Sequence, residues 1–211
     1  MDVAPLYSLR LKTPRLELRF GSRDELVELG RLAEKGVHPP EDMPFAVAWT
    51  DRIGEPGSRD GFVSYHEHYL ADWSPDEWSL NLLVRKNGEL AGTQGVFAKR
   101  FAQQRRVGTG SWLGRAHQGH GVGTEMRAAV LELAFRGLGA LEAESTWLEG
   151  NAASMRVSEK LGYVEQGVGE KSPRGVPIAE YGVVIARDAW LCPLPVAIEG
   201  LEPCLPLFGI T

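Results

Sequence analysis

Hydrophobic and polar residues recur along the chain with the periods of strands and helices, and the first half predicts one strand followed by two helices. Alternation over residues 16–20 predicts a strand, and Ser22 with Glu25 is a capping-box signature for a helix that runs to about Lys35. A second helix is predicted from about residue 59. Its aromatic residues recur at a helical spacing, so we expect them to pack in the core: Phe62, Tyr65, Tyr69 and Trp73.

The second half of the chain predicts strands and helices in alternation. Segments 79–84 and 89–96 flank Asn87-Gly88, a strong hairpin signal, and 106–113 is a third antiparallel strand. A helix over 124–136, a strand over 141–148, a helix from Asn151 to Lys160 and strands at 163–168 and 180–185 follow. The predicted order is βααβββαβαββ, which is an α/β (α+β) domain.

Composition and charge restrict the class of protein. The chain has 211 residues, of which 43% are hydrophobic and 24% are charged, as in a folded globular domain. The formal net charge is −5 and no run of Lys or Arg stands out, which argues against nucleic acid as the partner. The chain shows no signal-peptide pattern and no apolar run of 18 residues, so we expect a cytoplasmic protein with no membrane partner.

Cysteine and histidine are too sparse and too scattered to predict a metal site. Cys192 and Cys204 are the only cysteines and are expected to stay unpaired. His66 and His68 are two residues apart and point to different faces of a helix. We therefore expect no metal.

The segment from Gln118 to Thr124 is rich in glycine and stands directly before a predicted helix. Backbone N–H groups in such a loop can approach an anion, and the positive end of the helix dipole faces the same point. The segment fits neither the dinucleotide-binding nor the P-loop pattern. It predicts a phosphate cradle, and a loop that only turns the chain is the alternative.

Three segments in order carry a resemblance to a known family. The segments QGHGVGTEM, EAESTWLEG and NAASMRVSEKLGY resemble the GNAT superfamily of acyl-CoA-dependent N-acyltransferases, and TPRLELR at 13–19 is similar to the start of its RimJ/RimL-type branch. The resemblance runs from about residue 12 to 188. It implies the GNAT fold, a central mixed, mostly antiparallel sheet with splayed strands, flanked by helices, in a domain over residues 1–190.

The resemblance also implies a site for coenzyme A, with acetyl-CoA or succinyl-CoA as cosubstrate. Main-chain groups of Trp112 and Leu113 would hold the pantetheine arm, with Asn151 contacting it. Arg156 or Lys160 would reach the adenosine phosphate, and ordinary solvated charges are the alternative. The loop residues expected to hold the pyrophosphate are Gln118, Gly119, His120, Gly121, Val122, Gly123 and Thr124.

The catalytic groups follow from the resemblance and from amine chemistry. Ser154 is the first candidate for the acid that protonates the departing thiolate, and Ser158, where many relatives have tyrosine, is the second. No carboxylate lies on the strand before the glycine loop. Glu144 and Glu170 are the candidate bases, although solvated carboxylates are the simpler interpretation, and Glu125 is interpreted as structural. Deprotonation at pH 7 costs roughly 1.1 kcal/mol for an α-amine and roughly 4.6 kcal/mol for lysine, so direct attack with a water relay suffices for an α-amine.

The acceptor pocket is expected between residues 37–57 and the two N-terminal helices. Glu41, Asp42 and Asp51 would give it a negative lining that attracts a cationic amine, and a solvated loop is the alternative. Trp49 would form a wall of the pocket or belong to the core.

The C-terminal tail, residues 191–211, combines four prolines with many apolar residues. It is too polar and broken to span a bilayer and cannot form a regular helix. We expect it to pack on the domain or on a neighbouring subunit, which predicts a homodimer.

Together these features predict an N-acyltransferase that acts on the amino terminus of a protein or peptide, or on a similar primary amine. One alternative is a small-molecule N-acyltransferase whose acceptor is an aminoglycoside, a polyamine or an amino-acid metabolite. The other is a CoA-binding regulatory module without turnover.

Overall fold

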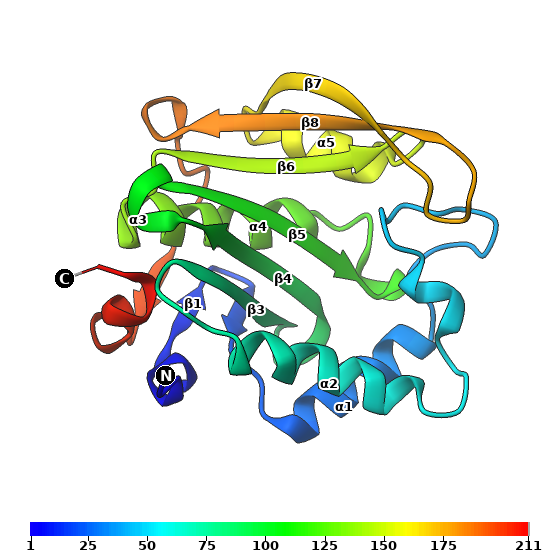
Figure 1. Ribbon diagram of the computed structural model, residues 1–211, viewed down its shortest axis with the longest axis horizontal. Helices are drawn as coiled ribbons and strands as arrows, with labels where there is room; N and C mark the ends of the chain where they lie inside the picture. Colours follow the sequence, from blue (N-terminus) through cyan, green and yellow to red (C-terminus); the bar gives the residue numbers. More distant parts are fainter. Residues whose placement is uncertain (211) are drawn as a thin grey trace.

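The computed structural model describes residues 1–210 and contains one open nine-stranded sheet (Figure 1). Its spatial order is β7-β8-β6-β5-β4-β3-β2-β1-β9. Only β5 and β6 are parallel neighbours, so the predicted mixed, mostly antiparallel sheet is confirmed. The strands are β1 (Arg10–Lys12), β2 (Leu16–Arg19), β3 (Glu77–Lys86), β4 (Glu89–Lys99), β5 (Arg106–Leu113), β6 (Glu142–Leu148), β7 (Val164–Lys171), β8 (Ile178–Ala186) and β9 (Ala197–Glu199).

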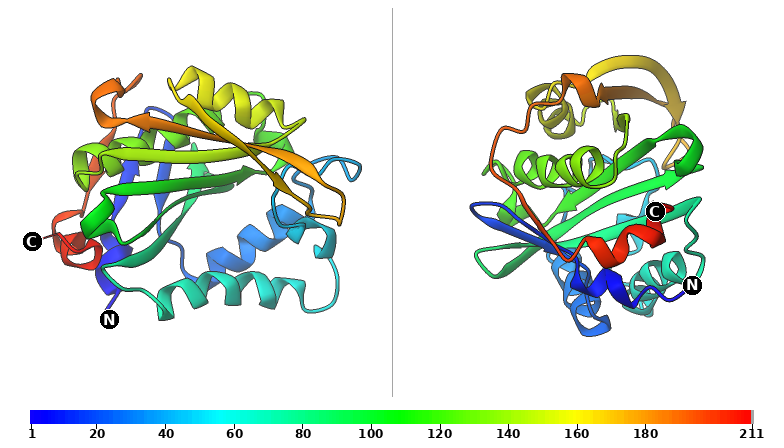
Figure 2. Two further views of the ribbon diagram at one scale, coloured as in Figure 1. Left: turned by 45° about the horizontal axis from the view of Figure 1, so that its top comes forward. Right: turned by 90° about the vertical axis from the view of Figure 1, so that its left-hand side faces the viewer.

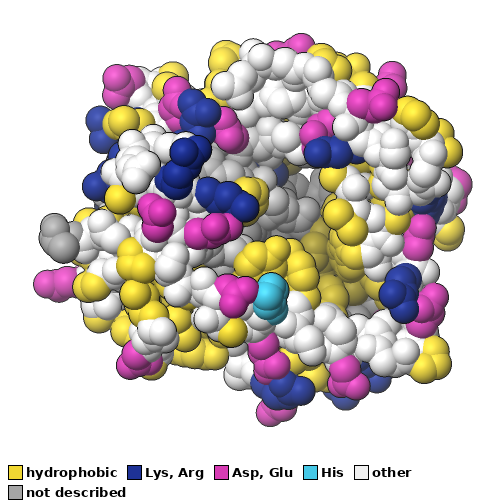
Figure 3. Space-filling model, in the orientation of Figure 1, with side chains coloured by type: hydrophobic (Ala, Val, Ile, Leu, Met, Phe, Trp, Pro, Cys, Tyr) yellow, Lys and Arg dark blue, Asp and Glu magenta, His cyan; other side chains and the backbone are white. Residues whose placement is uncertain are grey.

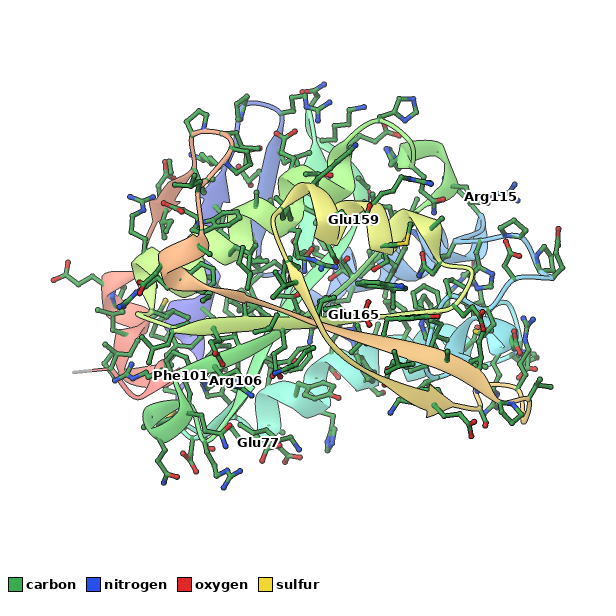
Figure 4. The ribbon with its side chains drawn as sticks, turned by 90° about the horizontal axis from the view of Figure 1, so that it is seen from above. Glu77, Phe101, Arg106, Arg115, Glu159 and Glu165 are labelled. Atoms are coloured by element: carbon green, nitrogen blue, oxygen red, sulfur yellow. The ribbon has the colours of Figure 1, made fainter. Side chains whose placement is uncertain are left out.

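Helices cover both faces of the sheet. The α-helices are α1 (Arg23–Glu34), α2 (Ser58–Ala71), α3 (Phe101–Gln104), α4 (Val122–Glu132) and α5 (Ala152–Lys160). Seen from above, Glu159 on α5 and Glu77 at the start of β3 lie on opposite sides of the sheet (Figure 4). Shorter turns are η1 (Ala4–Ser8), η2 (Trp49–Arg52), η3 (Arg115–His117), η4 (Leu133–Gly137), η5 (Arg187–Ala189) and η6 (Glu202–Phe208). Within residues 1–210 no helix is long and apolar enough to cross a membrane.

Two local signals read from the sequence are present in the structure. Ser22 and Glu25 form the capping box of α1, in which the Ser22 N–H donates to Glu25 Oε2 over 3.1 Å. Asn87 and Gly88 both have positive φ, 50° and 87°, as the tight turn between β3 and β4 requires.

The main core lies between the sheet and α4, which is buried on nearly all sides. Ala128, Val130 and Leu131 of α4 are fully buried, as is Val96 on β4. Because α4 is anchored along its length, its N-terminus is held in a fixed place relative to β5.

The predicted packing of the aromatic residues of α2 in the core is correct for Trp73 only, and Trp73 lies beyond the end of the helix. Trp73 is 4% exposed, whereas Tyr65 is 54% exposed and Phe62 and Tyr69 are half-buried. The helix buries Val63 and His66 instead. The physical reason is that space remains between α2 and the sheet, so the rings border a cavity.

The C-terminal tail packs on its own chain. β9 pairs with β1, and Phe208 of η6 is fully buried against Trp73 and Trp78, with ring centroids 5.5 and 4.8 Å away. The Trp73 indole donates to the Leu207 carbonyl over 2.8 Å. Figure 2 shows the red C-terminal segment beside the blue N-terminal one. These contacts remove the exposed apolar tail as a reason to expect a dimer, and the dimer stays a prediction.

Candidate active site

β5 and β6 separate part-way along their length. They pair only over residues 106–108 of β5, and two hydroxyls bridge the strands where the pairing ends. Thr109 Oγ1 donates to the Glu144 carbonyl over 3.2 Å, and Ser145 Oγ donates to the Thr109 carbonyl over 3.3 Å. Residues 110–113 then pair with β4 alone, and the two strands diverge (Figure 1). We call residues 110–113 the open edge of β5; such an edge can receive an extended ligand through main-chain hydrogen bonds.

A buried arginine lies at the fork between β5 and β6. Arg127 of α4 is 3% exposed, and its Nη1 donates to Ser145 Oγ over 2.9 Å. Its buried Nε has no hydrogen-bond partner within residues 1–210, and no carboxylate there lies within ion-pairing distance. Arg127 is therefore a buried cation beside the open edge, and the sequence analysis did not identify it.

The glycine-rich loop leads directly into the N-terminus of α4. Gly119 and Gly121 have φ of 76° and 78°, conformations that favour glycine, and Gly121 is the N-cap without any side-chain cap. The amide groups of the first turn are thus free of side-chain caps. The Gln118 side chain points elsewhere, because its Nε2 donates to the carbonyls of Val37 and Leu113 over 2.6 and 2.8 Å.

Arg15 is a cation beside this loop. Its Nη1 donates to the His120 carbonyl over 3.1 Å, and its Nε donates to Glu125 Oε2 over 2.7 Å. Glu125 is 5% exposed and also accepts a hydrogen bond from Thr13 over 2.6 Å. Glu125 thus ties α4 to the hairpin of β1 and β2, in line with its structural interpretation, and its ion pair with Arg15 places that guanidinium next to the loop.

Helix α5 carries the other predicted CoA residues. Asn151 caps it by accepting a hydrogen bond from Ser154 N over 3.1 Å, while its Nδ2 donates to the Pro44 carbonyl over 3.2 Å. Arg156 and Lys160 are exposed and form no ion pair within residues 1–210. Both cations are accordingly available for an anionic ligand.

The two candidate acids on α5 differ in their surroundings. Ser158 is 1% exposed, and its hydroxyl donates to the Ser154 carbonyl over 3.2 Å. Ser154 is half-buried, and its own hydroxyl forms no hydrogen bond with the described residues. This contrast favours Ser154 as the proton donor.

Neither candidate base is well placed in the structure. Glu144 forms an ion pair with Arg106 over 2.8 Å, at the end of the sheet where Figure 4 shows Arg106 near Phe101. Glu170 is exposed on β7, the edge strand of the sheet. Because neither lines the cavity described next, the expectation that they lie near the acceptor loses its support.

A cavity of about 1230 Å³ lies between α2, segment 45–58 and the sheet. Figure 3 shows a hollow bordered by hydrophobic side chains. Gly110, Ser111 and Trp112 of the open edge line this cavity, together with Trp49 and Phe62. It therefore reaches the fork from the face of the sheet opposite α4.

The carboxylates predicted to line this cavity are not the ones that do, which are Glu55, Asp72 and Glu77. Glu41 and Asp42 do not line it, and Asp51 is bound to Arg174. Aromatic rings are prominent in the lining because segment 45–58 and α2 direct Phe45, Trp49 and Phe62 into the space. Trp49, which was expected as wall or core, forms part of the wall.

His66 is a titratable group of this cavity that the sequence analysis considered only as a metal ligand. It is 7% exposed, and its Nδ1 contacts the Phe62 carbonyl at 3.0 Å. Since a carbonyl can only accept, Nδ1 carries the hydrogen and Nε2 keeps a free lone pair in the neutral ring. Burial lowers the pKa of His66 below its usual value. The neutral ring can thus act as a base.

The family model described as acetyltransferase (GNAT) domain matches residues 15–164. The chain is 28% identical over 116 residues to the protein named "Probable N-acetyltransferase YjcK" from Bacillus subtilis strain 168. That match covers 55% of this chain and 62% of the relative, so the chain spans about three fifths of the relative's length.

Two solved structures share the fold at low sequence identity. The fold matches Mycobacterium smegmatis RimJ in complex with CoA-disulfide with a TM-score of 0.68 and 16% identity, over 96% of this chain and 95% of that one. It matches RimL, named as a ribosomal L7/L12 alpha-N-protein acetyltransferase, with a TM-score of 0.61 and 16% identity, over 82% and 91%. The resemblance read from the glycine loop and the NAASMRVSEKLGY segment is confirmed: because the family model spans most of its length, the chain belongs to the GNAT acetyltransferase family.

Proposed function

We propose that this chain transfers an acetyl group from acetyl-CoA to a primary amine. One observation carries the proposal: the open edge of β5 lies between the glycine loop that leads into α4 and the large cavity on the other face of the sheet. A donor held along the edge and an acceptor held in the cavity would meet at residues 110–113. Direct transfer in a ternary complex follows from that arrangement.

The donor is held by groups from three elements. The pantetheine arm pairs with the main chain at Trp112 and Leu113, and the pyrophosphate accepts hydrogen bonds from the amides of the glycine loop. Arg156 and Lys160 are the proposed partners of the adenosine phosphate. Arg15, which is paired with Glu125, lies beside the loop and donates to the His120 carbonyl.

The reaction forms a nitrogen–carbon bond and breaks the carbon–sulfur bond of the thioester. The amine loses a proton to a water relay, for which His66 in the cavity lining is the proposed final acceptor, and the Ser154 hydroxyl protonates the departing sulfur before solvent restores it. An α-amine needs only about 1 kcal/mol for deprotonation at pH 7. No strongly basic carboxylate is then required.

We propose acetyl rather than succinyl as the transferred group. A succinyl carboxylate needs a free cation near the thioester, and the two cations of the cavity, Arg52 and Lys99, each form an ion pair with a glutamate. An acetyl group makes no such demand.

The acceptor has two candidate sources. A protein or peptide amino terminus is supported by the shared fold with RimJ and RimL, the latter named as an alpha-N-protein acetyltransferase. A small-molecule amine is supported by the cavity. Ordinary ligand sites measure roughly 300–1,000 Å³, so a volume of about 1230 Å³ leaves room for a small molecule.

Calorimetry with acetyl-CoA, succinyl-CoA and free CoA tests the proposal, followed by release of the CoA thiol in the presence of amines. We expect tight binding of acetyl-CoA and amine-dependent thiol release. Absence of CoA binding would remove the cofactor assignment. Binding without any turnover, unchanged by Ser154→Ala, would indicate a CoA-binding regulatory module.

A further inference from the structure

The charged groups that line the large cavity are nearly balanced. Arg52 and Lys99 each pair with a carboxylate of the lining, and the third carboxylate, Asp72, lies beside His68, so the lining carries a formal charge of −1 when His68 is neutral. The pairs are Arg52 with Glu55 at 3.2 Å, Lys99 with Glu77 at 2.9 Å, and His68, when protonated, with Asp72 at 3.3 Å. No cluster of free carboxylates is left to hold a polycation such as a polyamine or an aminoglycoside.

Aromatic rings form one side of the cavity, in two groups that meet at the His66 ring. We call this side the aromatic wall, and it consists of Phe45, Trp49, Phe62, Tyr65, Tyr69 and Trp112. Trp49 is its centre, with ring centroids 5.1 Å from Phe45, 5.9 Å from Phe62 and 5.6 Å from Trp112. None of these rings is fully buried. The wall therefore presents apolar ring surface to the cavity, which favours an apolar occupant.

The floor of the cavity has a gap in its side chains at one glycine, Gly110 of β5. Gly95 of β4 and Gly110 of β5 are register partners, and both line the cavity. A Cβ added at Gly110 would meet no atom closer than the Phe97 ring at 4.0 Å, so the space above this position is open. Above Gly95 the Asn81 side chain would lie 2.8 Å from such a Cβ. A planar group can thus lie over Gly110 and against the wall, with the Asn81 amide at its edge. Trp112 belongs both to the wall and to the open edge of β5, so the occupant reaches the proposed thioester position.

We propose that the acceptor amine is borne on an aromatic or similarly planar apolar body. An arylalkylamine and a peptide that begins with an aromatic residue share this chemistry. The inference rests on the proposed acetyl transfer and adds the acceptor class. Ring faces also attract the ammonium form of the amine, which brings the acceptor in before it loses its proton.

The test uses the full chain with acetyl-CoA and measures thiol release with matched amines. The panel contains tryptamine and phenethylamine, tripeptides that begin with Trp or Phe, tripeptides that begin with Ser or Ala, spermidine and kanamycin. We expect kcat/KM for the aromatic amines to exceed that for spermidine and kanamycin at least tenfold. The free amines and the aromatic-first peptides separate the two sources of the same chemistry.

A variant pair links the preference to the wall. Phe62→Leu keeps an apolar side chain but removes a ring, and we expect kcat/KM for the preferred aromatic amine to fall at least fivefold. Ser64→Ala on the exposed side of the same helix is the matched control and should change it less than twofold. Calorimetric binding of acetyl-CoA should stay within twofold in both variants, which shows that they are folded.

The outcomes separate this inference from the proposed function. Failure to bind acetyl-CoA contradicts the proposed function itself. Binding of acetyl-CoA with equal or faster turnover of spermidine, kanamycin or the Ser-first and Ala-first peptides overturns the aromatic acceptor and leaves acetyl transfer intact. Binding with no turnover of any aromatic amine overturns it as well.

Discussion

Arg174, in the connection between β7 and β8, donates two hydrogen bonds to Asp51 of η2, from Nε at 2.9 Å and from Nη2 at 2.6 Å. Its Nη2 also donates to the Pro40 carbonyl over 3.0 Å. The hydrogen bonds from Arg174 lower the pKa of the Asp51 carboxyl. Segment 37–57 is also held by Gln118 at Val37 and by Asn151 at Pro44. The segment that walls the cavity is therefore tied to the glycine loop, to α5 and to the β7–β8 connection.

Asp51→Asn tests this connection. Loss of the charged pair should loosen segment 37–57, so we expect the KM for the amine to rise about two- to fivefold, in keeping with a solvent-exposed ion pair, with kcat little changed. Steady-state kinetics with varied amine concentration measure both KM and kcat. Lys12→Gln breaks an exposed pair with Glu199 at the opposite edge of the sheet and serves as the control. Equal KM values in the two variants would contradict a role for the Asp51–Arg174 pair.

Ser154→Ala should reduce kcat while leaving the Kd of acetyl-CoA unchanged, because its hydroxyl is free to protonate sulfur and Ser158 is committed to a helix carbonyl. Loss of an acid–base group costs about 100-fold or more in rate. Rapid kinetics measure the rate of acetyl transfer, and calorimetry measures the Kd of acetyl-CoA, in the wild type and the variant. Ser158→Ala is the matched variant and should keep kcat within a few-fold; the reverse order would assign the acid to Ser158.

Gly121→Ala should weaken binding of acetyl-CoA about tenfold. The new Cβ would lie in a left-handed backbone conformation, 3.4 Å from Arg15 Nη2, at the point where the loop amides face the pyrophosphate. Gly139→Ala carries similar backbone strain, since its φ is 68°, but has no atom within 4 Å and lies away from the loop. Calorimetry should find normal affinity in that control. A normal affinity in Gly121→Ala would argue against the loop as the phosphate site.

His66→Gln should lower kcat about tenfold or more and change its pH profile. Burial lowers the pKa of His66 below its usual value of 6.5, so the ring is neutral at pH 7 and becomes protonated only at a more acidic pH. The kcat of the wild type should therefore fall as the pH drops below 6.5, and this acid limb of the pH profile should be absent in the variant. His68→Gln, at an exposed position two residues away, should keep it. An unchanged acid limb in His66→Gln would exclude His66 as the base.

Glu25→Gln should destabilise the fold at neutral pH. The hydrogen bond from Arg19, with those from Ser22 and Arg85, lowers the pKa of Glu25 from 4.5 to about 2. Because this pKa is lower in the folded state, the stabilisation is present above pH 4.5 and is lost as the pH falls towards 2. We expect a cost of about 1–2 kcal/mol at pH 7. Urea unfolding at pH 7 and pH 3.5 should show the difference between wild type and variant shrinking at the lower pH.

Local patterns determined much of this protein. The capping box at Ser22, the hairpin at Asn87-Gly88 and the glycines before α4 depend on backbone conformations within a few residues, which the sequence specifies directly. β1 and β9 were not predicted, because strands of three residues show no period and exist only by pairing with each other and with β2.

What only the tertiary structure decided is which side chains meet. Sheet order brings Arg106 into an ion pair with Glu144, and the divergence of β5 from β6 leaves Arg127 buried at the fork without a carboxylate among residues 1–210. The space under α2 turns a predicted core stripe into the wall of a cavity and places His66 in its lining. These contacts join residues far apart in the chain, and periodicity carries no information about such partners. The sequence alone thus determined the elements, the glycine loop and the family resemblance, while the cavity proposed for the acceptor exists only because α2 and segment 45–58 pack over the sheet with space between them.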